Sequence, residues 1–230
     1  MQKFDWIKRF YEIRNEGDTW KSISDIIPNK FDDYFLIHWN VGIVDNFPFD
    51  DYPLKNETIE ETNKRIKIEK EFGLFLNPNE SKLFRPITIK EIAERFNVAY
   101  DYNVLNNIKR TPAIKTLADL SISNLKLGLN KISQNESLNL FIEDIYRHSI
   151  DEINPKQEIE NLTIEDYFEW QQELGFDYCT YLFPKSMKWC ITTSENFDMF
   201  LCCKNELTSK IRSVFELELF PVKYEDKILQ

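Results

Sequence analysis

The helix starts of this chain constrain its fold more than any other feature. Thr58-x-x-Glu61, Thr88-x-x-Glu91 and Thr163-x-x-Asp166 each place a hydroxyl three residues before a carboxylate. In this arrangement the two side chains satisfy backbone N–H groups that the first turn of a helix leaves without partners. The pattern predicts helices that begin near residues 59, 89 and 164. They are expected to end near Phe72, Phe96 and Gly175.

Other segments extend this helical pattern. Leu138, Phe141, Ile142 and Ile145 repeat with the 3.6-residue period of a helix that is apolar on one face. Thr111-Pro112 indicates a further helix start, because proline costs little at the first helical position. Helices are also expected over residues 4–14, 117–132 and 206–215.

Strands are expected mainly in the last third of the chain. Apolar runs at residues 178–183, 189–193 and 198–203 indicate a β-meander, and residues 35–41 form a strand or a buried extended segment. The fold class predicted is α+β, predominantly α: a helical body with a C-terminal antiparallel β-meander and a closing helix.

A single domain over residues 1–230 is expected. The alternative is a boundary at Asn154-Pro155, which would separate a helical part (1–153) from a helix plus β-meander (154–230).

Charge is distributed unevenly. Twelve acidic and two basic residues fall between Glu136 and Asp177, and the whole chain has a net charge of −10. The rest of the chain has equal numbers of acidic and basic residues, so their charges cancel. A local field of one sign attracts cationic partners and repels nucleic acid, so this segment is the strongest functional signal.

Composition indicates a folded protein without a membrane segment. Hydrophobic residues make up 42% of the 230 residues and aromatic residues 14%, enough for a substantial core. The sequence contains neither the apolar core of a secretory signal nor the run of about 20 apolar residues of a membrane span. A cytoplasmic location and no membrane partner are expected. The cysteines, expected to be reduced thiols, are Cys179, Cys190, Cys202 and Cys203.

Five residues of the helix that follows Thr163 form the candidate partner-binding site. They are Glu165, Asp166, Glu169, Trp170 and Glu173. The three glutamates stand at four-residue steps, where like charges repel by roughly 0.2–0.5 kcal/mol per pair. A helix selected only for stability would place a lysine among them. The retained repulsion, beside an aromatic anchor, favours a site for a basic protein partner. The alternative is a charged face that only promotes solubility.

Residues 89–98 resemble the first half of a helix-turn-helix. Ala93 would let two helices approach closely, Asn97 would take the left-handed position of the turn, and Val98 would fill the core. The second helix, however, would carry asparagine at two positions that this motif buries. The net charge of −10 also opposes DNA binding, so nucleic acid is the alternative partner. Its candidate contacts are Arg95, Lys109 and Arg110.

No spacing in the chain is typical of a metal or catalytic site. His38 and His148 are far apart in the sequence, and the adjacent Cys202-Cys203 would point to opposite faces of a strand. We therefore expect no metal, no cofactor and no catalytic residue. An enzyme with a carboxylate site is a second alternative, because three acids lie among aromatic residues. They are Asp45, Asp50 and Asp51.

The C-terminal hairpin resembles a known family. Residues 181–194 (YLFPKSMKWCITTS) with 198–201 (DMFL) look like the closing hairpin of small bacterial immunity proteins from polymorphic toxin systems. That family ends with a tryptophan strand, a serine-containing turn and an apolar strand. The resemblance implies a cytosolic, non-enzymatic inhibitor that docks on a secreted toxin, often a basic nuclease. The leading hypothesis is therefore an immunity-type interaction protein that binds a basic protein, such as a toxin domain, through its acidic surface.

Overall fold

The chain forms two compact units. The computed structural model describes residues 3–13, 22–53, 58–75, 83–109, 111–134, 136–144, 158–174, 178–193 and 199–227. One unit comprises residues 1–37 and 124–230, and the other comprises residues 38–123. We call them the sheet unit and the inserted unit. Asn154-Pro155 lies outside the described residues, and the single-domain prediction stays a prediction.

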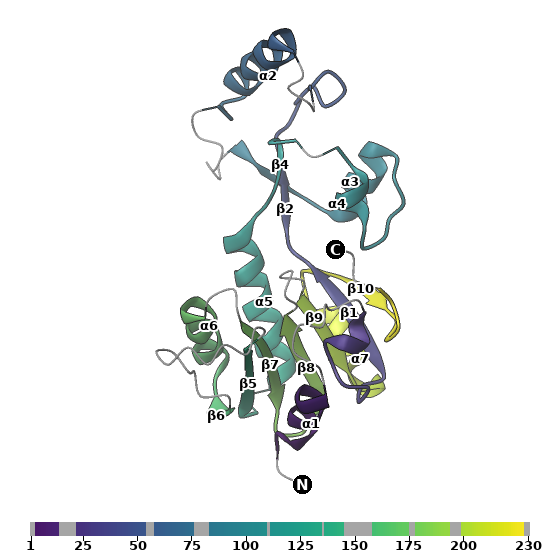
Figure 1. Cartoon of the computed structure of the whole chain (residues 1–230), viewed down its shortest axis with the longest axis vertical. Helices are drawn as coiled ribbons and strands as arrows, with labels where there is room; N and C mark the ends of the chain where they lie inside the picture. The colour runs from purple at the N-terminus through teal and green to yellow at the C-terminus, as the bar shows by residue number, and fades with distance from the viewer. Residues whose placement is uncertain are drawn as a thin grey trace. The chain divides into compact units, whose positions relative to one another are not determined.

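The sheet unit is built on a seven-stranded sheet in the order β10-β1-β9-β8-β7-β5-β6 (Figure 1). All pairs from β1 through β9, β8, β7 and β5 to β6 are antiparallel. The strands are β1 (Asp33–His38), β5 (Leu138–Asp144), β6 (Glu158–Leu162), β7 (Tyr178–Pro184), β8 (Trp189–Thr193), β9 (Met199–Cys203) and β10 (Glu218–Val222).

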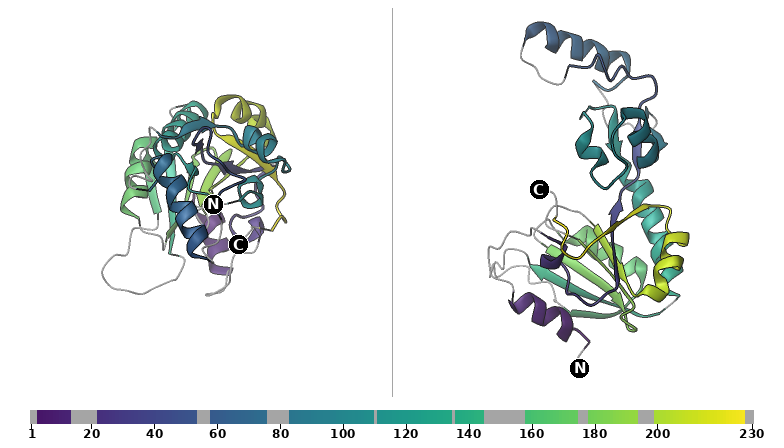
Figure 2. Two further views of the ribbon diagram at one scale, coloured as in Figure 1. Left: turned by 90° about the horizontal axis from the view of Figure 1, so that it is seen from above. Right: turned by 90° about the vertical axis from the view of Figure 1, so that its right-hand side faces the viewer.

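Helices pack on both faces of this sheet. On one face lie α1 (Asp5–Ile13) and the short helix η1 (Ile23–Asp25), and Phe4 and Ile7 pack there with Tyr181 and Phe183. The other face carries the C-terminal part of α5 (Ala118–Ser133), α6 (Ile164–Glu173) and α7 (Asn205–Val214). Figure 2 shows α1 in purple and α7 in yellow-green on opposite sides of the sheet.

The prediction of a predominantly helical body is wrong. Residues 138–144, expected to be a helix, form β5, which pairs with β6 on one side and β7 on the other. Every described side chain of β5, from Leu138 to Glu143, is buried, so the alternation that marks a half-exposed strand is missing. A short apolar run of this kind does not distinguish a buried strand from a helix. The meander at the C-terminus is therefore one part of a much larger antiparallel sheet.

The inserted unit contains a three-stranded sheet in the order β3-β2-β4. Its core cluster includes Ile43, Phe47, Phe49 and Phe84. The helix expected to start at Thr111-Pro112 does not form, because the chain there leads directly into β4. The elements are β2 (Val41–Ile43), α2 (Ile59–Glu71), β3 (Arg85–Ile87), α3 (Ile89–Phe96), α4 (Val104–Asn107) and β4 (Ile114–Thr116).

The three predicted helix starts are confirmed. Thr58, Thr88 and Thr163 are the N-caps of α2, α3 and α6, and each forms a reciprocal capping box with the carboxylate three residues later. The end of α2 also agrees, since Gly73 follows it with a φ of 72°, a conformation that glycine adopts at little cost.

Candidate functional site

One face of α6 is anchored on the sheet unit. Ile164, Tyr167 and Phe168 are buried. The Gln171 side-chain amide donates a hydrogen bond of 2.7 Å to the hydroxyl of Thr180 on β7. These contacts fix the rotation of the helix about its axis, so its opposite face is held toward solvent.

The N-terminus of α6 is fixed by its capping box. The Thr163 hydroxyl accepts a hydrogen bond from the Asp166 backbone N–H at 3.1 Å, and the Asp166 carboxylate accepts from the Thr163 backbone N–H at 2.8 Å. The Thr163 N–H, and next its hydroxyl, lower the pKa of Asp166 below its ordinary value. Asp166 thus has a structural role, and of the five predicted contacts it is the least available to a partner.

The three glutamates lie on the solvent side of α6. Glu165, Glu169 and Glu173 are exposed, and within the described part of the chain none of them forms an ion pair. Trp170 is half-buried beside them. The structure therefore brings together the three predicted carboxylates and the predicted aromatic residue along one helix. We call Glu165, Glu169, Trp170 and Glu173 the α6 surface.

Two other acids of the segment are neutralised by lysines of the N-terminal region. The Lys3 ammonium lies 2.6 Å from the Glu160 carboxylate, and Lys8 of α1 forms an ion pair with Glu158. These lysines are more than a hundred residues away in the sequence, so no local charge count reveals them.

Two further acids are used inside the sheet unit. Glu143 is buried and accepts a hydrogen bond of 2.7 Å from the Tyr181 hydroxyl. Glu136 accepts from the backbone N–H of Ser186 at 2.5 Å and from its hydroxyl at 3.0 Å. Among the described acids of the sequence segment, these two are therefore held by contacts within the sheet unit. Several charged residues of the segment from Glu136 to Asp177 lie outside the described residues: Arg147, Asp151, Glu152, Lys156 and Asp177.

The charge excess nevertheless belongs to the sheet unit. Its residues include 26 acids and 17 bases, whereas the inserted unit includes 13 acids and 12 bases. The α6 surface therefore lies on the unit that carries nearly all of the net charge.

The predicted nucleic-acid contacts do not form a groove-reading element among the described residues. Ala93 is buried and Asn97 is left-handed, with φ 51° and ψ 47°, as the helix-turn-helix resemblance predicts. The second helix, α4, has only four residues, about one turn, whereas the recognition helix of this motif lies along the major groove and presents several side chains to base edges. The Arg95 guanidinium lies 5.1 Å from the centroid of the Phe49 ring. Lys109 is exposed, and Arg110 lies outside the described residues.

Two of the three acids proposed for a carboxylate site, Asp45 and Asp51, are engaged with bases, and the third, Asp50, is exposed. Asp45 accepts hydrogen bonds of 3.1 Å from the Arg85 guanidinium, and Asp51 lies 3.8 Å from the ammonium of Lys64. Across the described ranges, no three histidine, cysteine or acidic side chains converge to hold a metal ion.

Comparison with known proteins does not identify a function for this chain. No family model, no curated protein and no solved structure matches this chain. In the part of the chain that the structure describes, every helix is too short or too polar to cross a lipid bilayer.

Proposed function

We propose that this chain is an interaction protein of the immunity type, without catalytic activity, that binds a basic protein partner through the α6 surface. The observation that carries the proposal is the set of three exposed carboxylates at Glu165, Glu169 and Glu173, without ion pairs among the described residues. Other described acids of the same segment have hydrogen-bonding or ionic partners: Glu136, Glu143, Glu158, Glu160 and Asp166. The described carboxylates without such partners are therefore those on this helix.

The physical argument concerns the rate of association. Charges at the edge of an interface steer oppositely charged partners and raise the association rate, while buried aromatic side chains supply affinity. The α6 surface has both components, since Trp170 lies along the row of glutamates and is half-buried in the unbound protein. A basic toxin domain has the charge that such a surface would attract.

The resemblance of residues 181–194 and 198–201 to immunity proteins supports an inhibitor role for the same unit. A cytoplasmic location goes with this proposal, because an immunity protein must meet its toxin inside the cell that it protects.

The test is charge reversal with a matched control. The chain is immobilised and used to capture basic proteins from cells that encode it, at low and at moderate salt, and association rates are measured for the purified partner. Changing Glu165, Glu169 and Glu173 to lysine should lower the association rate at low salt at least tenfold and flatten its salt dependence.

The control has the same change in net charge at exposed acids elsewhere. Glu71, Glu216 and Glu225 are exposed and lie off α6, and their triple lysine variant should keep most of the wild-type rate. Equal losses in both variants would show that only net charge matters. An unchanged rate in the α6 variant would remove the site assignment.

A further inference from the structure

Among the described residues, the three-stranded sheet of the inserted unit has an open edge at β4. Val44 N–H donates to the Ala113 carbonyl at 2.9 Å, and Leu117 N–H donates to the Asn40 carbonyl at 2.8 Å. Bonding residues alternate along an antiparallel pair, so residues 113, 115 and 117 face β2. The backbone groups of Ile114 and Thr116 therefore point away from the sheet.

The opposite edge of the sheet is closed by a proline. The same alternation makes Val41 and Ile43 bond to Ile87 and Arg85 on β3, and Pro86 is the residue between them. Its nitrogen faces outward and has no hydrogen to donate, which blocks a further strand. On β4, Thr116 keeps its outward N–H.

Three outward backbone groups of β4 have no hydrogen-bond partner among the described residues. The Ile114 N–H donates to the Thr111 carbonyl at 3.3 Å. This leaves the Ile114 carbonyl and both backbone groups of Thr116 for an incoming strand. Thr116 is exposed, and no further strand of the described residues pairs with β4.

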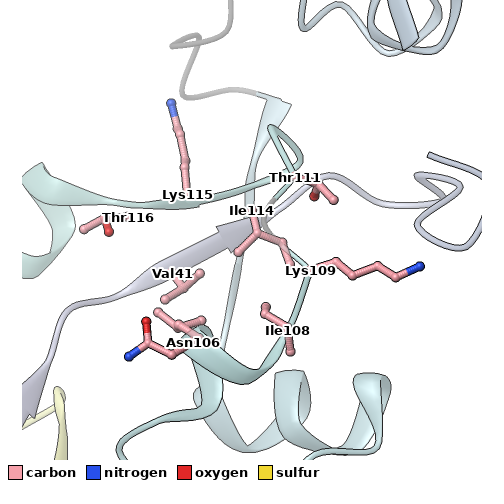
Figure 3. A pocket seen from close by; sticks show the side chains of 9 residues that line it. Val41, Asn106, Ile108, Lys109, Thr111, Ile114, Lys115 and Thr116 are labelled. Atoms are coloured by element: carbon pink, nitrogen blue, oxygen red, sulfur yellow. The ribbon is translucent and has the colours of Figure 1, made fainter. Parts of the chain in front are cut away.

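Two cavities flank this edge, and Lys115 and Thr116 line both of them. One, of about 330 Å³, is walled by Val41, Ile108 and Ile114. Figure 3 shows these three side chains pointing toward one another, with Lys115 leaving the strand on the side opposite to Ile114. The other cavity, of about 480 Å³, includes Phe84, Pro86, Leu117 and Leu120. Side chains of a strand alternate between the two faces of a sheet, so an added strand could fill both cavities.

The charges around the edge favour an acidic partner. Lys109 and Lys115 line the first cavity and no described acid does, whereas the second cavity is lined by Lys115 and one acid, Asp119. Lys115 places its ammonium 4.3 Å from the centroid of the Phe84 ring, and among the described residues neither lysine forms an ion pair. In the first cavity, Thr111 has a buried hydroxyl without a hydrogen-bond partner in the described structure.

We propose that the outer edge of β4 binds an extended acidic segment of another protein by strand addition. Its backbone bonds to Ile114 and Thr116, its apolar side chains enter the two cavities, and its carboxylates meet Lys109 and Lys115. Strand addition gives affinity through main-chain bonds and specificity through such alternate pockets. This site lies on the inserted unit and does not depend on the α6 surface.

The experiment uses a short peptide probe and two variants of one residue. The probe is acetyl-Glu-Val-Ile-Val-Glu-amide, titrated into the ¹⁵N-labelled full chain and followed by NMR. Thr116→Pro removes the outward N–H and leaves the bonds to β2 in place, whereas Thr116→Val keeps that N–H. We expect saturable shifts centred on residues 114–117 in the wild type and in Thr116→Val, and at least a tenfold weaker affinity in Thr116→Pro.

Two altered peptides complete the test on the wild-type chain. A probe N-methylated at alternate backbone positions cannot pair as a strand and should not bind, and a probe with lysines in place of its glutamates should bind more weakly. Equal binding of the N-methylated probe, or equal binding to Thr116→Pro, would overturn strand addition even if one variant folded poorly. The absence of shifts near β4 with the first probe would overturn the site.

Discussion

The Phe215 ring packs directly on Gly128 in the interior of α5. A β-carbon at position 128 would lie 2.7 Å from the Cδ1 atom of Phe215, closer than such atoms approach in folded proteins. The glycine is therefore required by packing, although glycine is unfavourable inside a helix. The close approach joins α5 to the segment that follows α7.

Gly128→Ala should lower the free energy of unfolding. Alanine would improve helix propensity by about 1 kcal/mol, but the overpacked methyl group should cost more, with a net loss of about 1–2 kcal/mol. Urea unfolding of the two proteins measures the difference. In a Phe215→Ala background the same substitution should become neutral or stabilising, because the ring that it meets is gone. Additive losses would contradict this explanation.

The α6 capping box should make stability depend on pH. The pKa of Asp166 is lowered by the N–H and hydroxyl of Thr163, so its ionised form stabilises the folded state. This contribution is present above the ordinary pKa of 3.8 and is lost as pH falls through the lower folded value. Asp166→Asn should therefore destabilise the protein near neutral pH and have little effect in strong acid.

Thr163→Ala removes the other half of the same box. Loss of an N-cap hydroxyl costs about 1 kcal/mol, and urea unfolding near neutral pH should show a loss of this size. Glu173→Gln removes an acid at the other end of α6 without affecting the capping box. As the control for Asp166→Asn, it should change stability much less than that variant does. A pH-independent effect of Asp166→Asn would show that its charge is not used by the cap.

The cysteines should be inert toward a thiol reagent in the folded protein. All four are buried, and none of them forms a disulfide bond. Burial raises the pKa of Cys203 to about 11 and that of Cys202 well above its usual value, so little thiolate exists near neutral pH. DTNB should modify none of them before unfolding and all four in denaturant. A thiol that reacts rapidly in the native protein would contradict the packing described for β7, β8 and β9.

Tyr167 should contribute to loss of stability at alkaline pH. Burial raises its pKa to about 12 in the folded state from an ordinary 10.0. Its contribution is thus complete below pH 10.0 and is lost as pH rises through about 12, because only the unfolded state ionises easily in that window. Tyr167→Phe should reduce the fall in stability between these limits. Tyr100→Phe, at an exposed position, should leave the fall unchanged.

The sequence predicts those features of the fold that depend only on residues close together in the chain. The capping boxes at Thr58, Thr88 and Thr163 involve only backbone groups within one turn, so their residues suffice to predict them. The apolar runs at residues 189–193 and 198–203 also predict strands, and the structure has β8 (Trp189–Thr193) and β9 (Met199–Cys203) there. The pairing of β1 with β9 joins residues far apart in the sequence, and no local pattern reveals it.

In the candidate sites too, features set by neighbouring residues are predictable from the sequence, and contacts between distant residues are not. Exposure of Glu165, Glu169 and Glu173 follows from helical spacing and was predictable. The pairing of Glu158 and Glu160 with lysines near the N-terminus was not, because it depends on how α1 meets β6. The sequence does not predict the edge at Thr116, since Thr111-Pro112 is typical of a helix start and the chain forms β4 there instead.

The order of the chain has a consequence for biosynthesis. Strand β1 is made early but pairs with β9, so the large sheet can close only after the C-terminal third has left the ribosome. Residues 38–123 are contiguous and can acquire structure sooner. During translation the nascent chain should therefore hold the partnerless β1 for most of its synthesis, a period in which a chaperone that shields strand edges would matter most.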